Sequence, residues 1–62
     1  DKDEEAIKYF EIALNKAGNK NALYNLGVSY YDLGDKETAK KYLKQAALNG
    51  DKDAKLMLDG ME

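Results

Sequence analysis

Thr38-Ala39-Lys40-Lys41-Tyr42-Leu43, followed by Ala46, carries the strongest signal in this chain because it nearly repeats an earlier stretch. Glu5-Ala6-Ile7-Lys8-Tyr9-Phe10, followed by Ala13, lies 33 positions before it. A second set recurs after 32 positions, with Gly18, Ala22 and Leu26 returning as Gly50, Ala54 and Leu58. A period in the low thirties is the length of one helical hairpin in a solenoid of stacked repeats. Such repeats share a core and present a surface, so the sequence indicates binding rather than chemistry.

The composition excludes several classes of function. The chain has 62 residues, a net charge of −2, ten Lys and neither Arg, His nor Cys. A phosphate-backbone binder is expected to show a basic stripe and Arg forks, so no nucleic-acid partner is predicted. The apolar runs are a few residues long against the roughly 20 that span a membrane, and no signal peptide opens the chain, so we expect a soluble protein with no membrane partner. Without thiol or imidazole ligands, no cofactor and no metal site is expected.

Apolar periodicity predicts four helices, over about residues 3–16, 20–33, 36–49 and 51–60, separated by glycines that lie at breaks in the pattern. Gly18 is predicted to end the first helix in a left-handed cap. The next helices have candidate N-terminal caps in Asn19 or Asn21, in Asp35, and in Asp51 or Asp53. Along the first helix the predicted packed stripe is Ala6, Phe10, Ala13, Leu14 and Ala17, and along the fourth it is Ala54, Met57, Leu58 and Met61.

Gly27 lies inside the second predicted helix, where glycine costs up to about 1 kcal/mol relative to alanine. Its presence predicts that a neighbouring helix comes too close for a Cβ atom. The best candidate is the helix over 36–49, whose stripe of Ala39, Leu43 and Ala46 permits close approach. The predicted fold is therefore all-α, with antiparallel helical hairpins stacked as a short right-handed α-solenoid. Residues 1–62 form one domain, made of a half repeat (1–18), a full repeat (19–50) and a half repeat (51–62).

Residues 21–35 resemble the first helix and turn of a tetratricopeptide repeat. Leu26-Gly27 and Tyr30 match the Leu-Gly and Tyr of that family, and the stripe of the following helix matches its Ala, large apolar and Ala positions. The chain departs from the family at Leu23, where Trp is frequent, and at Asp51, where Pro usually closes the unit. Residues 44–54, followed by Leu58, look more like a Sel1-like repeat.

The resemblance implies a site. In such repeats the first helices line a concave groove that binds a peptide or a partner protein, through residues off the packed stripe. Carried over by position, the partner-binding residues are Asn21, Tyr24, Val28, Tyr31, Asp32 and, 32 positions after Tyr24, Leu56. Tyr24, Val28 and Tyr31 share one helical face, and tyrosine is enriched at binding hot spots. The alternative is that both tyrosines simply pack against the next helix.

Two other classes of function bear on this sequence, catalysis and self-association. An enzyme is not expected, because Ser29 is the only serine and no His, Cys or Arg could complete a catalytic constellation, so no catalytic residue is predicted. Self-association as a homo-oligomer through the terminal helices is the alternative function, because an isolated array exposes both ends. The predicted residues are Ile7 and Ile12, with Tyr9, at one end, and Met57 and Met61 at the other.

Overall fold

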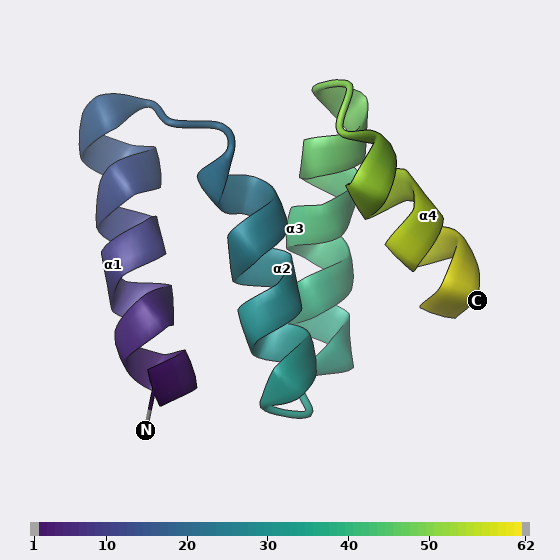
Figure 1. Ribbon diagram of the computed structural model, residues 1–62, viewed down its shortest axis with the longest axis horizontal. Coiled ribbons are helices and arrows are strands. Elements are labelled where there is room, and N and C mark those ends of the chain that lie inside the picture. The colour runs from purple at the N-terminus through teal and green to yellow at the C-terminus, as the bar shows by residue number, and fades with distance from the viewer. Residues whose placement is uncertain (1, 62) are drawn as a thin grey trace.

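The computed structural model describes residues 2–61, and this range contains four helices joined by short turns (Figure 1). They are α1 (Lys2–Ala17), α2 (Ala22–Asp32), α3 (Lys36–Leu48) and α4 (Lys52–Met61). Each helix runs antiparallel to the next and packs against it. The predicted all-α stack of helical hairpins is confirmed. The helix bounds agree with prediction to within two residues, and α4 continues through Gly60 instead of ending there.

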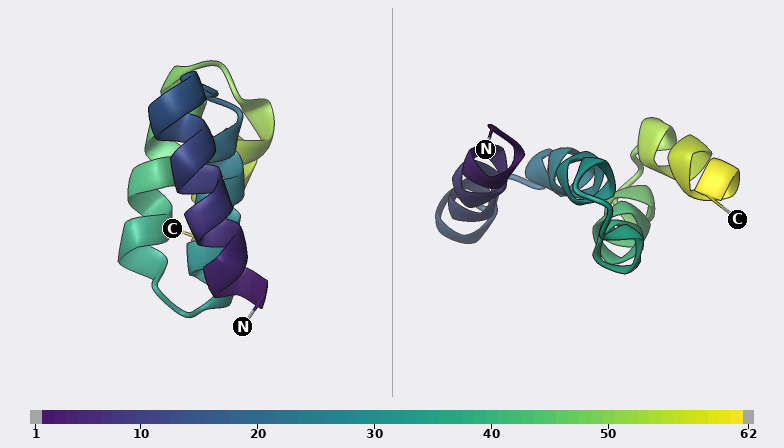
Figure 2. Two further views of the ribbon diagram at one scale, coloured as in Figure 1. Left: turned by 90° about the vertical axis from the view of Figure 1, so that its left-hand side faces the viewer. Right: turned by 90° about the horizontal axis from the view of Figure 1, so that it is seen from below.

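The helices form a row in which α1 occupies one end. Seen along the helices, α2 and α4 lie on one side of α3, and α3 lies behind them in the view of Figure 1 (Figure 2). Because α3 contacts both α2 and α4, it serves as the common support for the face that these two helices present.

Two turns with the same construction join the last three helices. Gly34 and Gly50 have φ of 92° and 94°, a left-handed conformation that glycine adopts without steric cost. The N–H of the aspartate that follows each glycine donates to a carbonyl five residues earlier, at 2.9 Å for Asp35 and 3.0 Å for Asp51. This is the bonding pattern of a Schellman cap, so each glycine ends its helix as the sequence pattern predicts.

The side chains of the same aspartates begin the next helices. Asp35 Oδ1 accepts the N–H of the residue three positions on at 3.2 Å, and Asp51 Oδ1 does the same at 3.1 Å. Asp51 rather than Asp53 therefore caps α4. At the start of α2, the side chain of Asn21 makes no capping bond. Asn19 Oδ1 instead accepts the Asn21 N–H at 3.1 Å, which stabilises the turn before the helix.

The core lies mainly between α2 and α3. Its largest fully buried side chains are Leu26 and Leu43, and the other buried apolar residues are Ile7, Ala22, Leu23, Ala39, Ala46 and Ala54. Gly27 packs directly against α3, since a Cβ atom built there would lie 2.6 Å from Leu43 Cγ. The predicted close approach of this helix pair is confirmed.

The orientation of α1 differs from prediction. Ile7, expected off the packed stripe and available for self-association, is buried at 8% exposure, so that expectation is wrong. Ile7 is the buried residue of α1 within the described side chains, and Ala6, Phe10, Ala13 and Leu14 of the predicted stripe are half-buried. The side chain of Ala17 lies outside the described part of the structure. Half of the residues of this helix are apolar, so periodicity alone did not identify Ile7 as the centre of its packed side.

Candidate functional site

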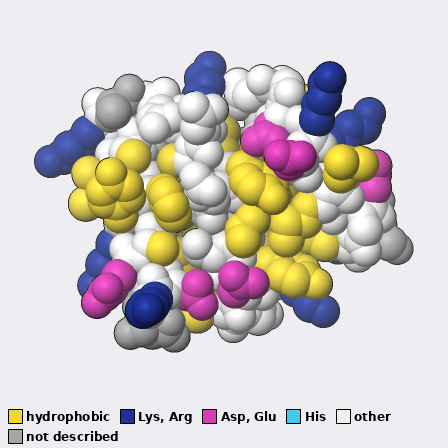
Figure 3. All heavy atoms as spheres, viewed as in Figure 1, with side chains coloured by type: hydrophobic (Ala, Val, Ile, Leu, Met, Phe, Trp, Pro, Cys, Tyr) yellow, Lys and Arg dark blue, Asp and Glu magenta, His cyan; other side chains and the backbone are white. Residues whose placement is uncertain are grey.

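The face formed by α2 and α4 carries an apolar surface. Hydrophobic side chains gather over and between these two helices in the space-filling view (Figure 3). On α2, Tyr24 and Val28 are half-buried, and Tyr31 is 38% exposed. Their spacing of four and three residues places them on one side of the helix, about 140–160° around from Leu26 at about 100° per residue. We call these three residues the α2 strip.

Tyr24 does more than face solvent, because it also packs against the core cluster of Leu23, Leu43, Ala46 and Ala54. This contact is in keeping with the alternative of a packing role for this tyrosine. Tyr31, at the other end of the strip, is more open, and Lys36 Nζ lies 6.0 Å from the centre of its ring. Polar residues flank the strip, with Asn21 exposed before it and Asp32 exposed after it.

On α4, the packed side is formed by Ala54, Met57, Leu58 and Met61, of which only Ala54 is fully buried. The two methionines and Leu58 are half-buried and contact the same core cluster as Tyr24. Met57 and Met61, predicted for self-association, therefore offer only part of their surface to a second molecule. The sequence assigned them both to the packed side of this helix and to self-association, and it did not show that they share the core cluster with Tyr24.

Leu56 is 69% exposed and stands apart from this cluster. It is two residues after Ala54, as Tyr24 is two residues after Ala22, so the two side chains leave their helices in equivalent directions. Tyr24 is partly covered by the core cluster against which it packs. Leu56 is more open, and it adds an exposed apolar side chain to α4.

A polar cluster on the opposite side of α2 joins three helices. The Tyr30 hydroxyl donates to Glu11 Oε1 at 3.2 Å, and the rings of Tyr30 and Tyr42 stack with centroids 5.6 Å apart. Burial and then the hydrogen bond to Glu11 raise the pKa of Tyr30, and burial and the Glu11 charge raise the pKa of Tyr42. Both phenols are therefore neutral at pH 7, which suits a structural contact and not a proton-transfer site.

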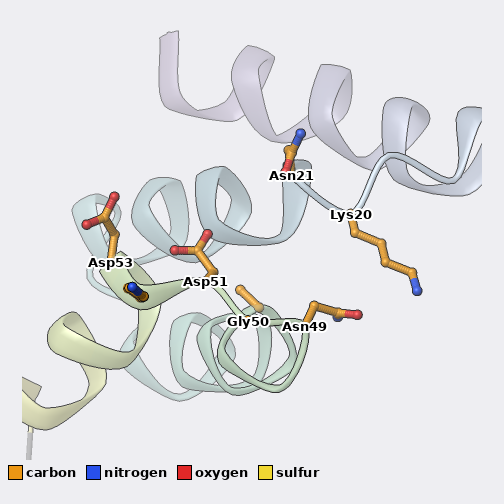
Figure 4. Close-up of a pocket in the computed structure, with 8 residues that line it drawn as sticks. Lys20, Asn21, Asn49, Gly50, Asp51 and Asp53 are labelled. Carbon is orange, nitrogen blue, oxygen red and sulfur yellow. The ribbon is translucent and has the colours of Figure 1, made fainter.

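A pocket of about 740 Å³ lies at the end of the stack where the α1–α2 loop approaches the α3–α4 turn (Figure 4). Its lining residues are Lys20, Asn21, Ala46, Asn49, Gly50, Asp51, Lys52 and Asp53. Asp51 is engaged as the cap of α4, and Asn49 Nδ2 donates to the Gln45 carbonyl at 2.8 Å. These polar groups hold the turn, and acids and bases alternate around the pocket with no convergent set of one charge.

Residues 2–61 offer few features typical of a nucleophilic site, a metal site or a membrane span. Ser29, the only serine, is 7% exposed and lies within the helix packing. No three acidic side chains in residues 2–61 are grouped closely enough to hold a metal ion. None of the helices over this range has the length and apolar character needed to cross a bilayer.

Comparison with known proteins agrees with the helical arrangement. Residues 21–49 match the family model of the tetratricopeptide repeat, a segment that comprises α2, α3 and the turn between them. No curated protein and no solved structure matches the chain. The likeness of residues 44–54 to a Sel1-like repeat stays a prediction. Tetratricopeptide repeats in general are protein-interaction modules, and the central hairpin of this chain, residues 21–49, matches the model of that repeat.

Proposed function

We propose that this chain binds a short peptide segment of a partner protein on the face formed by α2 and α4. The proposed contacts are Asn21, Tyr24, Val28, Tyr31, Asp32 and Leu56. The observation that carries the proposal is the α2 strip, an aromatic and aliphatic row that remains partly open although a hydrophobic core is available beside it. Open apolar patches with a polar rim are typical of interaction sites.

The strip suits a peptide because of its length and rigidity. Tyr24 and Tyr31 are seven residues apart, which is about 10 Å along the helix and matches three to four residues of extended chain. Tyrosine gives a large contact area and has few rotatable bonds to immobilise. The ring of Tyr24 is already held by the core, so little further conformational entropy is lost on binding.

The polar residues at the two ends of the α2 strip suggest which groups a bound peptide would carry. Asp32 is exposed at the C-terminal end of α2 and directly follows Tyr31 in the chain. A peptide with two apolar side chains facing the tyrosines and a lysine or arginine near Asp32 would match both the apolar row and the carboxylate. Asn21, at the other end, offers an amide that can hydrogen-bond a peptide backbone.

The residue types present in this chain favour a binding role over catalysis. The chain has no His, Cys or Arg, and within residues 2–61 the groups with a raised pKa are two tyrosines held in a packing contact. Tetratricopeptide repeats in general act through binding.

The test is to select peptides from a displayed random library against this chain and to measure their affinities for variants by fluorescence polarisation at micromolar protein. Tyr31→Ala is the main variant, because Tyr31 is exposed and its loss leaves the core intact. Tyr9→Ala is the matched control, since it removes an equally large side chain that is 70% exposed on α1. Val28→Lys places a charge in the middle of the strip.

We expect Tyr31→Ala to weaken binding by about 10-fold or more, as for a hot-spot residue, and Tyr9→Ala to change it less than about twofold. Val28→Lys should weaken peptides that carry a lysine or arginine most strongly. Selected peptides that bind Tyr31→Ala and Val28→Lys as tightly as the unmodified chain would refute this location of the site.

A further inference from the structure

The outer side of α1 carries a row of four exposed residues, Glu5, Tyr9, Ile12 and Lys16. Their spacing of four, three and four residues places them on one side of the helix. At about 100° per residue this side lies nearly opposite Ile7, the buried residue of α1. Tyr9 is 70% exposed and Ile12 is 56% exposed, so two large apolar groups face solvent in its middle. We call these four residues the α1 row.

The α1 row reads acid, apolar, apolar, base from its N-terminal end to its C-terminal end. This order is complementary to itself when two copies meet antiparallel. Glu5 of each copy then faces Lys16 of the other, and Tyr9 of each copy faces Ile12 of the other. Within one chain Glu5 and Lys16 cannot pair, because 11 residues of helix separate them by about 16 Å.

From this self-complementary order we propose that two copies of the chain associate through antiparallel α1 helices, with two-fold symmetry. The apolar centre removes Tyr9 and Ile12 from water, and the two Glu5–Lys16 pairs set the antiparallel direction. A contact through one helical row is smaller than the roughly 1,200 Å² at the lower end of stable interfaces, so the dimer is weak and forms at sub-millimolar concentration. The α2 strip is not part of the interface, so this inference is independent of the proposed peptide site.

A head-to-tail stack is the competing arrangement, in which α4 of one copy packs against α1 of the next as α2 packs against α3. The sequence of α4 disfavours it. Lys55 and Asp59 stand 32 positions after Leu23 and Gly27, and both are exposed. In the α2–α3 packing, a Cβ atom at Gly27 would already lie 2.6 Å from Leu43 Cγ. Asp59 occupies the equivalent position on α4, so its larger side chain cannot be accommodated in the same packing.

Reversing the charge of Glu5 or of Lys16 tests the proposal, and a mixture of the two variants serves as the control. Sedimentation equilibrium from micromolar to millimolar concentration should show a monomer–dimer equilibrium for the unmodified chain. Glu5→Lys and Lys16→Glu should each weaken the dimer by about 10-fold, because each places like charges opposite one another at both ends. An equimolar mixture of the two variants should restore association, since every lysine then faces a glutamate in the heterodimer.

Two further variants separate the interface from the fold. Ile12→Lys should abolish the dimer. It should leave the helicity measured by circular dichroism unchanged, because Ile12 is not part of the buried core. Lys41→Glu makes the same charge change on an exposed position of α3 and should leave the dimer intact. A monomer at all concentrations, a dimer indifferent to the charge reversals, or a mixture that fails to associate would each overturn the proposal.

Discussion

Gly27 and Gly60 are both helical glycines, yet the structure predicts opposite effects when each is replaced by alanine. A Cβ atom at Gly27 would lie 2.6 Å from Leu43 Cγ, 2.7 Å from Leu43 Cδ2 and 3.3 Å from the Ala39 carbonyl oxygen. A Cβ atom at Gly60 would meet nothing within 4 Å. The pair therefore isolates the close approach of α2 to α3 from the intrinsic preference of a helix for alanine.

The magnitude follows from two opposing contributions. Alanine is favoured over glycine in a helix by about 1 kcal/mol. Overpacking a core costs about 1–3 kcal/mol, and a contact this far inside the usual carbon–carbon distance of about 3.5–4.0 Å belongs at the upper end. Leu43 is fully buried, so its side chain cannot relieve the contact by moving outward into solvent. Gly27→Ala should therefore lower the free energy of unfolding by about 2 kcal/mol, whereas Gly60→Ala should raise it by up to about 1 kcal/mol.

Thermal unfolding followed by circular dichroism measures both changes. For a domain of this size 1 kcal/mol corresponds to roughly 4–8 °C in Tm, so Gly27→Ala should melt about 10 °C lower and Gly60→Ala a few degrees higher. Dilute protein keeps association out of the measurement. An unchanged or higher Tm for Gly27→Ala would show that α2 and α3 do not pack as closely as described, and the reasoning would fail.

Three further predictions concern the core, a cap and alkaline pH. Leu43→Asp should unfold the chain, because a buried unpaired carboxylate costs several kcal/mol, whereas Leu48→Asp on the same helix should be nearly neutral, since Leu48 is 88% exposed; circular dichroism at 222 nm compares the two. Asp35→Ala should lower the free energy of unfolding by about 1 kcal/mol, and Asp35→Asn, which keeps an acceptor for the α3 N–H group, by much less, measured by urea denaturation. Stability should be fully present below about pH 10 and fall as pH rises beyond it, because the folded state raises the pKa of Tyr30 and Tyr42 and so holds their protons more tightly than the unfolded state. Tyr30→Phe should make the loss shallower in urea denaturation repeated from pH 8 to 11, and an equally steep loss would contradict this assignment.

Most of the helical framework was predictable because its signals are local. A glycine in a left-handed conformation ends one helix, and the aspartate after it caps the next helix within four residues. The turns at Gly34-Asp35 and Gly50-Asp51 could therefore be predicted without knowledge of the fold. The close packing at Gly27 was also predictable, because a glycine inside a strongly helical segment has a cost that only a neighbour can offset.

The candidate site was only partly predictable. The spacing of Tyr24, Val28 and Tyr31 identifies a shared face, but the sequence does not show how much of Tyr24 is covered by core contacts. Met57 and Met61 pack against the same core cluster as Tyr24 because α4 packs against α3, and this depends on the angle between the helices. Whether a peptide binds there stays a prediction.

The sequence by itself determined the number of helices, their bounds and the pairing of α2 with α3, because caps, glycines and helical periodicity act over a few residues. Only the tertiary structure decided which side of α1 is buried, since Ile7 and Ile12 are both apolar and lie on different sides of the helix, and the packing of α1 against α2 buries Ile7 and leaves Ile12 exposed. The same holds for the Glu11–Tyr30 hydrogen bond, whose partners are 19 residues apart. Such choices depend on the relative placement of whole helices, and no local pattern encodes that placement.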